Sequence, residues 1–164
     1  MTFTQTVSAS AVDSAVVSNT ATVSDPRTGD SNDSSTASTT VRHPRLTLIK
    51  SIASRVNAAD QFTVRIVNGI TTVGTATTVG AGTSATTGAV LAAAGSYTLS
   101  EVMAAGSIST IGQYTNFISC TNSNATSTTV LPSGAGTSFM VSPTGLDNIT
   151  CTFTNTPRPA LISV

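Results

Sequence analysis

The stretch Leu46-Thr-Leu48-Ile-Lys50 carries a lysine at the end of an alternating apolar pattern. Successive side chains of a β-strand point to opposite faces, so Lys50 is predicted to share a face with both leucines. The same pattern ends in a glutamate in Tyr97-Thr-Leu99-Ser-Glu101 and in an asparagine in Cys151-Thr-Phe153-Thr-Asn155. We therefore predict three strands that each point one polar group into an apolar interior.

The two charged residues of these stretches are unique in the chain. Among seven basic and seven acidic residues, Lys50 is the sole lysine and Glu101 is the sole glutamate. Burying an amine, a carboxyl and a carboxamide is costly unless the three groups bind one another. Two structural explanations stay open: a buried Lys50–Glu101 ion pair that also binds Asn155, or strand ends that turn out to solvent.

A chemical explanation is an intramolecular isopeptide bond. A neutral Lys50 amine would attack the side-chain carbon of Asn155 and ammonia would leave, while protonated Glu101 polarises the amide oxygen and shuttles protons. Burial favours both protonation states, because an apolar environment lowers the pKa of a lysine and raises that of a carboxyl. The reaction needs no cofactor and no metal, and it occurs once per molecule, so no enzymatic turnover is expected.

The composition around these stretches favours an all-β fold. Thr and Ser supply 55 of the 164 residues, whereas aromatic residues make up 4%. Thr and Val suit pleated sheets, and Ser and Gly suit turns, so we predict an Ig-like or prealbumin-like β-sandwich with an N-terminal β arm. The strands predicted after residue 45 are Leu46–Ile52, Gln61–Val67, Thr71–Val79, Tyr97–Met103, Tyr114–Thr121, Ser127–Leu131, Ser138–Val141 and Asn148–Thr154.

Turn signals separate these strands. Asn68-Gly69 is typical of a tight β-hairpin. The pentapeptide Gly-Ala-Gly-Thr-Ser occurs at residues 80–84 and again at 134–138, and both copies are interpreted as loops. The patch Ala89–Ala94 favours a helix but is too short to form one.

Residues 1–44 differ from the rest and are predicted to form an arm. Short strand patterns occur at Val7–Val12, Val16–Val23 and Thr36–Val41, and a polar loop is predicted at Asp25–Asp33. A segment of this size with one phenylalanine cannot bury a core of its own. The arm is either part of a truncated repeat domain or a strand donor that adds to the sheet of another copy.

The three alternating stretches resemble the signature strands of CnaB-type domains, also called SpaA-like or prealbumin-fold domains, of bacterial surface adhesins and pilins. The resemblance covers residues 45–159 and keeps the family's order of Lys50, Glu101 and Asn155-Thr-Pro157. It implies that Lys50 and Asn155 form the crosslink and that Glu101 is the proton shuttle. Residues 1–44 resemble the last strands of another surface-protein repeat, and 160–164 are expected to link to a following segment.

The cysteines and charges indicate the compartment and exclude some partners. Cys120 and Cys151 are an even pair in a Thr- and Ser-rich sequence, which favours a disulfide and an extracellular location over two free cytosolic thiols. The net charge is zero, and no basic stripe is available for nucleic acid. No stretch is long and apolar enough for a membrane-spanning helix, and the first residues have no signal-peptide pattern.

These features predict a structural stalk or filament module on a bacterial cell surface, mechanically locked by the isopeptide bond. Its partners would be neighbouring domains or copies of the same protein, and strand addition through residues 1–44 is one way in which they would be joined. The alternative is a ligand-binding adhesin module, although the Gly-, Ala-, Ser- and Thr-rich loops offer few groups for specific recognition.

Overall fold

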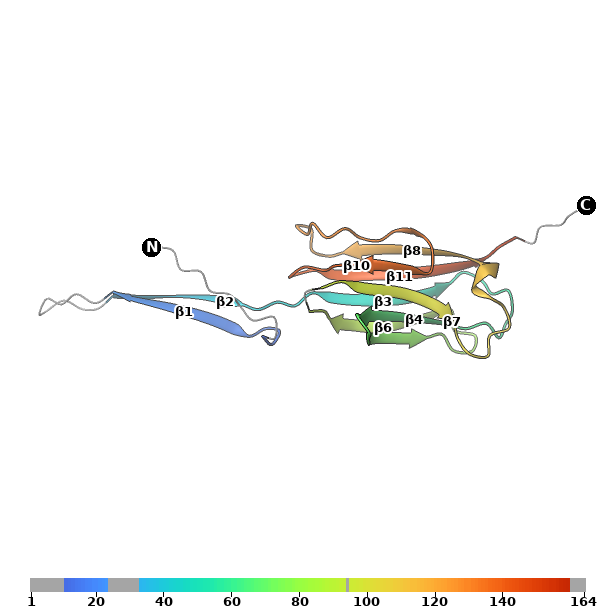
Figure 1. The fold of residues 1–164 in the computed structure, drawn as a ribbon, viewed down its shortest axis with the longest axis horizontal. Helices are drawn as coiled ribbons and strands as arrows, with labels where there is room; N and C mark the ends of the chain where they lie inside the picture. The colour runs from blue at the N-terminus through green and yellow to red at the C-terminus, as the bar shows by residue number, and fades with distance from the viewer. Residues whose placement is uncertain (1–10, 24–32, 94, 160–164) are drawn as a thin grey trace, which may run out of the picture. The chain divides into compact units, whose positions relative to one another are not determined.

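The computed structural model describes residues 11–23, 33–93 and 95–159, which divide into two units between Arg42 and His43. The first unit contains the strands β1 (Val16–Val23) and β2 (Asp33–Thr40). The elements of the second unit (Figure 1) are β3 (Arg45–Ile52), β4 (Phe62–Asn68), β5 (Thr71–Thr77), β6 (Ser84–Leu91), β7 (Tyr97–Met103), the 3-10 helix η1 (Ile111–Gln113), β8 (Tyr114–Asn122), β9 (Gly134–Ala135), β10 (Ser138–Val141) and β11 (Asn148–Pro157).

The second unit is a sandwich of two sheets, which confirms the predicted all-β fold. One sheet has the strand order β10-β7-β4-β5 and the other β6-β3-β11-β8-β9. Its first and last strands, β3 and β11, lie side by side and run parallel, with Lys50 opposite Phe153 (Figure 1). β11 is therefore an interior strand that joins β3 to β8, with which it pairs antiparallel.

The core lies between the two sheets. Every second residue of β3 and β11 is buried, as the alternating pattern predicts. One apolar cluster contains Leu48, Leu99 and Phe153, and a smaller one contains Ile52, Phe62 and Tyr114. Each fully buried large side chain contributes about 1.5–3 kcal/mol to folding.

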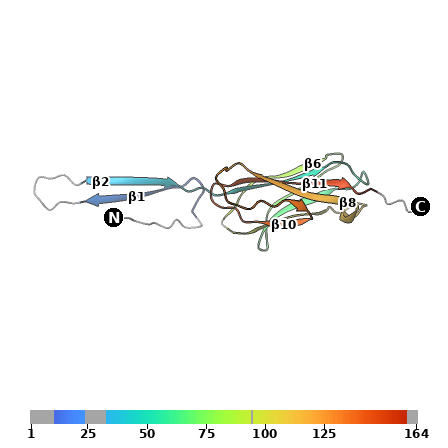
Figure 2. The same ribbon diagram turned by 90° about the horizontal axis from the view of Figure 1, so that it is seen from above.

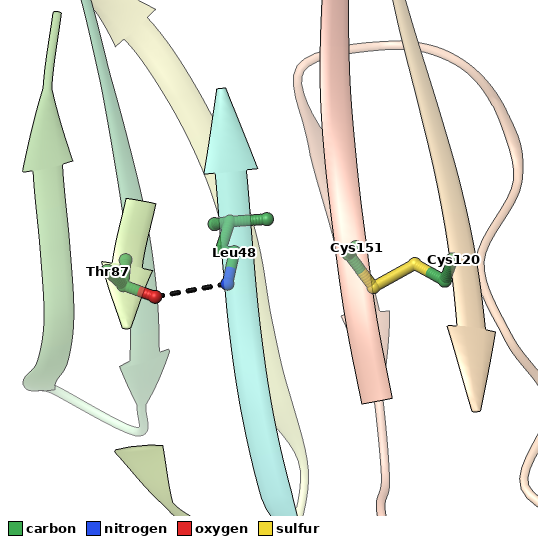
Figure 3. The surroundings of a disulfide bond; sticks show 4 residues. All are labelled: Leu48, Thr87, Cys120 and Cys151. Carbon is green, nitrogen blue, oxygen red and sulfur yellow. Dashed lines mark hydrogen bonds between the residues drawn. A yellow bond between two sulfur atoms is a disulfide. The ribbon is translucent and has the colours of Figure 1, made fainter. Parts of the chain in front are cut away.

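The strand β6 was not predicted, because its Ser-, Ala- and Gly-rich sequence has little apolar pattern. It forms by pairing with the edge of β3, with a register shift beside Leu48. At the shift the Leu48 N–H donates to the Thr87 hydroxyl at 3.0 Å, as Figure 3 shows. Gly88 follows with a φ of 66°, a conformation that costs glycine little. The first Gly-Ala-Gly-Thr-Ser copy is thus a turn that leads into β6.

The predicted strand Ser127–Leu131 is wrong, because this segment lies in the loop between β8 and β9. Its Thr129 hydroxyl donates to the buried Asp147 carboxylate, so a side chain rather than a β-ladder fixes the segment. The second Gly-Ala-Gly-Thr-Ser copy is also more ordered than predicted, since it contains β9 and the start of β10.

The first unit is a two-stranded antiparallel hairpin that pairs Val16 with Thr40 (Figure 2). Hydroxyl pairs such as Ser18–Ser38, at 2.9 Å, join the strands across one exposed face. β2 begins earlier than the predicted Thr36. Residues 11 and 12 are not in a strand, and the remainder of the predicted Val7–Val12 strand lies outside the described residues, as do residues 24–32 and 160–164. Among the described residues, no helix is long and apolar enough to cross a membrane.

Candidate functional site

Lys50 points from β3 into the interior of the sandwich and is 0% exposed. Its Nζ atom lies 2.9 Å from Oε2 of Glu101 and donates to the backbone carbonyl of Phe153 at 3.3 Å. The Phe62 ring lies beneath the amine, with its centroid 4.6 Å from Nζ. Burial lowers the pKa of Lys50 to about 8, although the attraction of Glu101 acts in the opposite direction.

Glu101 reaches the same point from the opposite sheet. It lies on β7, where it pairs with Val64 of β4, and it is 2% exposed. The ion pair with Lys50 therefore crosses the core from one sheet to the other. Burial raises the pKa of Glu101 above its ordinary value, while Lys50 and the Asn155 carboxamide partly offset this effect.

Asn155 lies on the inward face of β11 and is 0% exposed. In the parallel ladder it pairs with Ile52, two residues beyond Lys50, so the Lys50 and Asn155 side chains are diagonal neighbours on one face. Neither polar atom of the Asn155 carboxamide has a partner in good hydrogen-bond geometry among the described residues. The carboxamide is nevertheless close enough to Glu101 to lower the pKa of that carboxyl.

The structure thus brings Lys50, Glu101 and Asn155 into one buried site. Between unperturbed groups, moving a proton from a lysine to a glutamate costs about 8 kcal/mol. Burial reduces this cost here, because it lowers the pKa of Lys50 and raises that of Glu101. The surroundings therefore make a neutral amine beside a neutral acid less costly than it is in water, with the Asn155 carboxamide next to the pair.

The two cysteines lie directly opposite each other on β8 and β11. The structure joins Cys120 and Cys151 in a disulfide (Figure 3) with the Cα atoms 4.0 Å apart. Cys151 points to the same inward face as Phe153 and Asn155, because these residues alternate along β11. The disulfide therefore attaches β8 to the strand that carries Asn155.

Comparison with protein families assigns the second unit. A family model described as a prealbumin-like fold domain matches residues 45–157. The chain belongs to this family. The match confirms the resemblance to SpaA-like prealbumin-fold domains that the three alternating stretches indicate. A search of curated protein sequences found no match.

A search of solved structures found two chains that are similar to this one. They are the major pilin of Streptococcus pyogenes and its N168A mutant, each 13% identical to this chain. The TM-scores are 0.44 for the pilin and 0.42 for the mutant. The alignments cover 89% and 85% of this chain but only 65% and 61% of the two pilin chains, respectively.

Two buried aspartates of the prealbumin-like unit were missed in the sequence. Asp60 and Asp147 are 0% and 1% exposed. Each carboxylate accepts the N–H of the residue three positions earlier, Asn57 or Thr144, and each aspartate N–H donates to that same residue's carbonyl. A polar residue three positions before an aspartate is the sequence signal for such a turn. Both aspartates tie loops together at the ends of the strands.

Of the two buried aspartates, Asp60 is the one chosen to test whether an ionised carboxylate stabilises the fold. It accepts hydrogen bonds from the Ser109 N–H, at 2.9 Å, and from the Tyr114 hydroxyl. Burial disfavours its charge, but these bonds outweigh burial and hold the pKa of Asp60 well below its ordinary range. Among the described residues, no three His, Cys, Asp or Glu side chains gather to hold a metal ion.

We expect Asp60→Asn to lower the free energy of unfolding by about 2–4 kcal/mol, because an amide NH₂ cannot accept the bonds that one carboxylate oxygen accepts. The depressed pKa means that this stability is present above the unfolded pKa of about 4 and is lost as the pH falls. Denaturant unfolding at neutral and acidic pH measures both effects. If the difference in the free energy of unfolding between wild type and Asp60→Asn stays constant as the pH falls, the stabilisation does not depend on an ionised Asp60.

Proposed function

We propose that the prealbumin-like unit is a structural stalk or fibre module of a bacterial cell surface, locked by an isopeptide bond between Lys50 Nζ and Asn155 Cγ. Glu101 is the proton shuttle, and the chain has no turnover as an enzyme. The module works outside the cell, with neighbouring domains or copies of the same protein as its partners. The family assignment and the buried site support this function.

The reaction balances without a cofactor. A proton moves from Lys50 to Glu101, and the neutral amine attacks Asn155 Cγ while the Glu101 hydroxyl hydrogen-bonds to Oδ1. The second amine proton leaves through Glu101 to Nδ2, the Cγ–Nδ2 bond breaks, and ammonia departs. One amide and one ammonia replace one amine and one carboxamide, and Glu101 ends protonated, with its hydroxyl free to donate to the new amide oxygen.

The observation that carries the proposal is the fully buried Asn155 carboxamide, neither polar atom of which has a partner in good hydrogen-bond geometry among the described residues. A buried polar group that lacks a partner costs about 1–3 kcal/mol. A simple Lys50–Glu101 ion pair gives no reason for this cost. Crosslinking removes the Nδ2 group and leaves one oxygen that Glu101 can bind.

The crosslink is tested by the intact mass of the purified chain after the disulfide is reduced. We expect the wild type to be lighter than its sequence mass by one ammonia, and Glu101→Ala to keep the full mass. A wild-type chain with its full mass would rule out the bond.

We expect crosslinking to slow as the pH rises above about 8, the pKa of Lys50. The reactive pair holds one proton, which sits on Glu101 when the amine is neutral. Above the lysine pKa this proton is lost, and below the raised Glu101 pKa a second proton blocks the amine. Refolding the chain across a pH series and following the loss of ammonia should give a bell-shaped rate profile. A rate that keeps climbing above pH 8 would contradict the role of Glu101.

A ligand-binding adhesin remains the second candidate. A groove of about 480 Å³ lies between the β8–β9 loop and β10, and its lining includes Thr128, Val130, Pro132 and Met140. The groove lining contains no aromatic or charged side chain, the types that dominate binding energy. Direct binding assays against a glycan array would reveal such a ligand.

A further inference from the structure

Asn155 has a second carboxamide beside it that the reaction above does not use. On the β8 side of β11, Asn116 lies directly opposite Asn155 in the antiparallel register. Both side chains therefore point to the inward face of the five-stranded sheet. Lys50 approaches Asn155 from β3, so the reacting asparagine lies between a lysine on one neighbouring strand and an asparagine on the other.

The backbone hydrogen bonds show that Asn116 and Asn155 form a non-hydrogen-bonded antiparallel pair, the type whose side chains lie closer together. The Asn116 carbonyl accepts from Gly136 N–H, on the β9 side, so its backbone groups point away from β11. Opposed residues without mutual backbone bonds bring their side chains closest together, with Cβ atoms about 4.5–5.5 Å apart. Cys120 and Cys151 occupy the equivalent position four residues along the same ladder, where the side chains meet in a disulfide.

The Asn116 side chain has an unused acceptor. Its Nδ2 atom donates to the Ile111 carbonyl at 3.4 Å, which leaves the Oδ1 atom on the other side of the amide. This Oδ1 is buried and has no partner among the residues that the structure describes. The Asn155 Nδ2 atom is an equally buried donor without a partner in good geometry, so the two groups are complementary although they are not hydrogen-bonded to each other in this structure.

We infer that Asn116 is a positioning residue for the crosslink: in the reacting arrangement its Oδ1 accepts a hydrogen bond from Asn155 Nδ2 and so turns Asn155 Oδ1 toward Glu101. The inference rests on the proposed function. An ionised Glu101 only accepts hydrogen bonds, so by itself it attracts the NH₂ group of Asn155 and holds the carboxamide in the unproductive orientation. Asn116 competes for that NH₂ group and leaves the carbonyl oxygen facing the acid that must polarise it.

Asn116 also stands where the leaving group departs. When the Cγ–Nδ2 bond breaks, the NH₂ nitrogen takes a third hydrogen, the proton passed on by Glu101, and leaves as ammonia beside the Asn116 oxygen. Asn116 is only partly buried, whereas Asn155 is fully buried. The orientation that Asn116 imposes therefore places the departing nitrogen on the side of Asn155 that is nearer to solvent.

The test compares Asn116→Val with Asn116→Thr, which have the same shape but differ in one acceptor oxygen. Each full-length chain is recovered unfolded in denaturant and refolded near neutral pH, and the loss of ammonia is followed by intact mass. We expect Asn116→Val to slow crosslinking by about 10- to 100-fold and Asn116→Thr to recover most of the wild-type rate. Refolding of both variants in a Lys50→Met background, which cannot crosslink, should give equal folding rates.

Each outcome assigns the failure to one claim. Asn116→Val that crosslinks at the wild-type rate, or Val and Thr variants that are equally slow, would overturn the role of Asn116 and leave the crosslink intact. A slower folding rate of the Val variant in the Lys50→Met background would assign the slow loss of ammonia to folding and also overturn it. A wild-type chain that never loses ammonia would overturn the proposed bond, and the inference with it.

Discussion

Asn155→Ala is expected to lower the free energy of unfolding of the second unit by about 4–5 kcal/mol. The proposed bond between Lys50 and Asn155 closes a loop of about 105 positions, and chain-entropy reasoning assigns this stabilisation to such a loop. The variant keeps the Lys50–Glu101 ion pair, so no buried charge loses its partner. For a unit of this size the melting temperature should fall by roughly 15–25 °C, measured by calorimetry on the oxidised protein.

Two matched variants separate the bond from local packing. Thr154→Ala changes the outward-facing neighbour of Asn155 and should keep both the mass loss and most of the stability. Glu101→Gln keeps the shape of the shuttle without its acid, so it should keep the full mass, and it should melt below Asn155→Ala because buried Lys50 also loses its charged partner. If Asn155→Ala has the same melting temperature as the wild type, the proposed covalent loop does not stabilise the fold.

The second large effect is expected under force. β3 and β11 are adjacent and parallel, so pulling on the two ends of the unit shears these two strands past each other. The proposed bond joins them directly, and the load then passes from Lys50 to Asn155 without entering the other strands. Single wild-type molecules pulled by their ends should show no unfolding of the segment between these residues below the force that ruptures covalent bonds.

Asn155→Ala, which lacks the proposed bond, is the comparison for the pulling experiment. The disulfide provides a second, known loop against which its extension is measured. Without the bond, the chain between residues 50 and 155 should extend by roughly 250 Å, because the disulfide still closes the 31 positions between Cys120 and Cys151. Reduction should add about another 100 Å. The hairpin of the first unit adds the same extension in every variant. Full extension of the oxidised wild type at low force would contradict the stalk function.

The alternating patterns predicted the buried part of the fold best. In β3, β7 and β11 large apolar residues mark one face, and burial of that face is the main contribution to folding. The same period placed Lys50, Glu101 and Asn155 inside, where the structure has them. Their meeting across two sheets required long-range pairing, which the sequence indicates only through the family resemblance.

The remaining elements depend on contacts that no local pattern records. β6 exists because β3 offers an open edge and because the Thr87 hydroxyl completes the ladder at Leu48. Ser127–Leu131 has strand composition but is fixed instead by the carboxylate of Asp147. Asn116 has no distinctive neighbours in sequence, and only the register opposite Asn155 makes it relevant.

The position of β11 affects how the protein matures. The strand between β3 and β8 is the last of the domain to leave the ribosome, so a nascent chain has a gap in the middle of its five-stranded sheet. Asn155, the proposed partner of Lys50, and Cys151, the disulfide partner of Cys120, both lie in residues 148–157 and are absent until this segment emerges. A prematurely terminated product therefore cannot be closed by either the proposed crosslink or the disulfide.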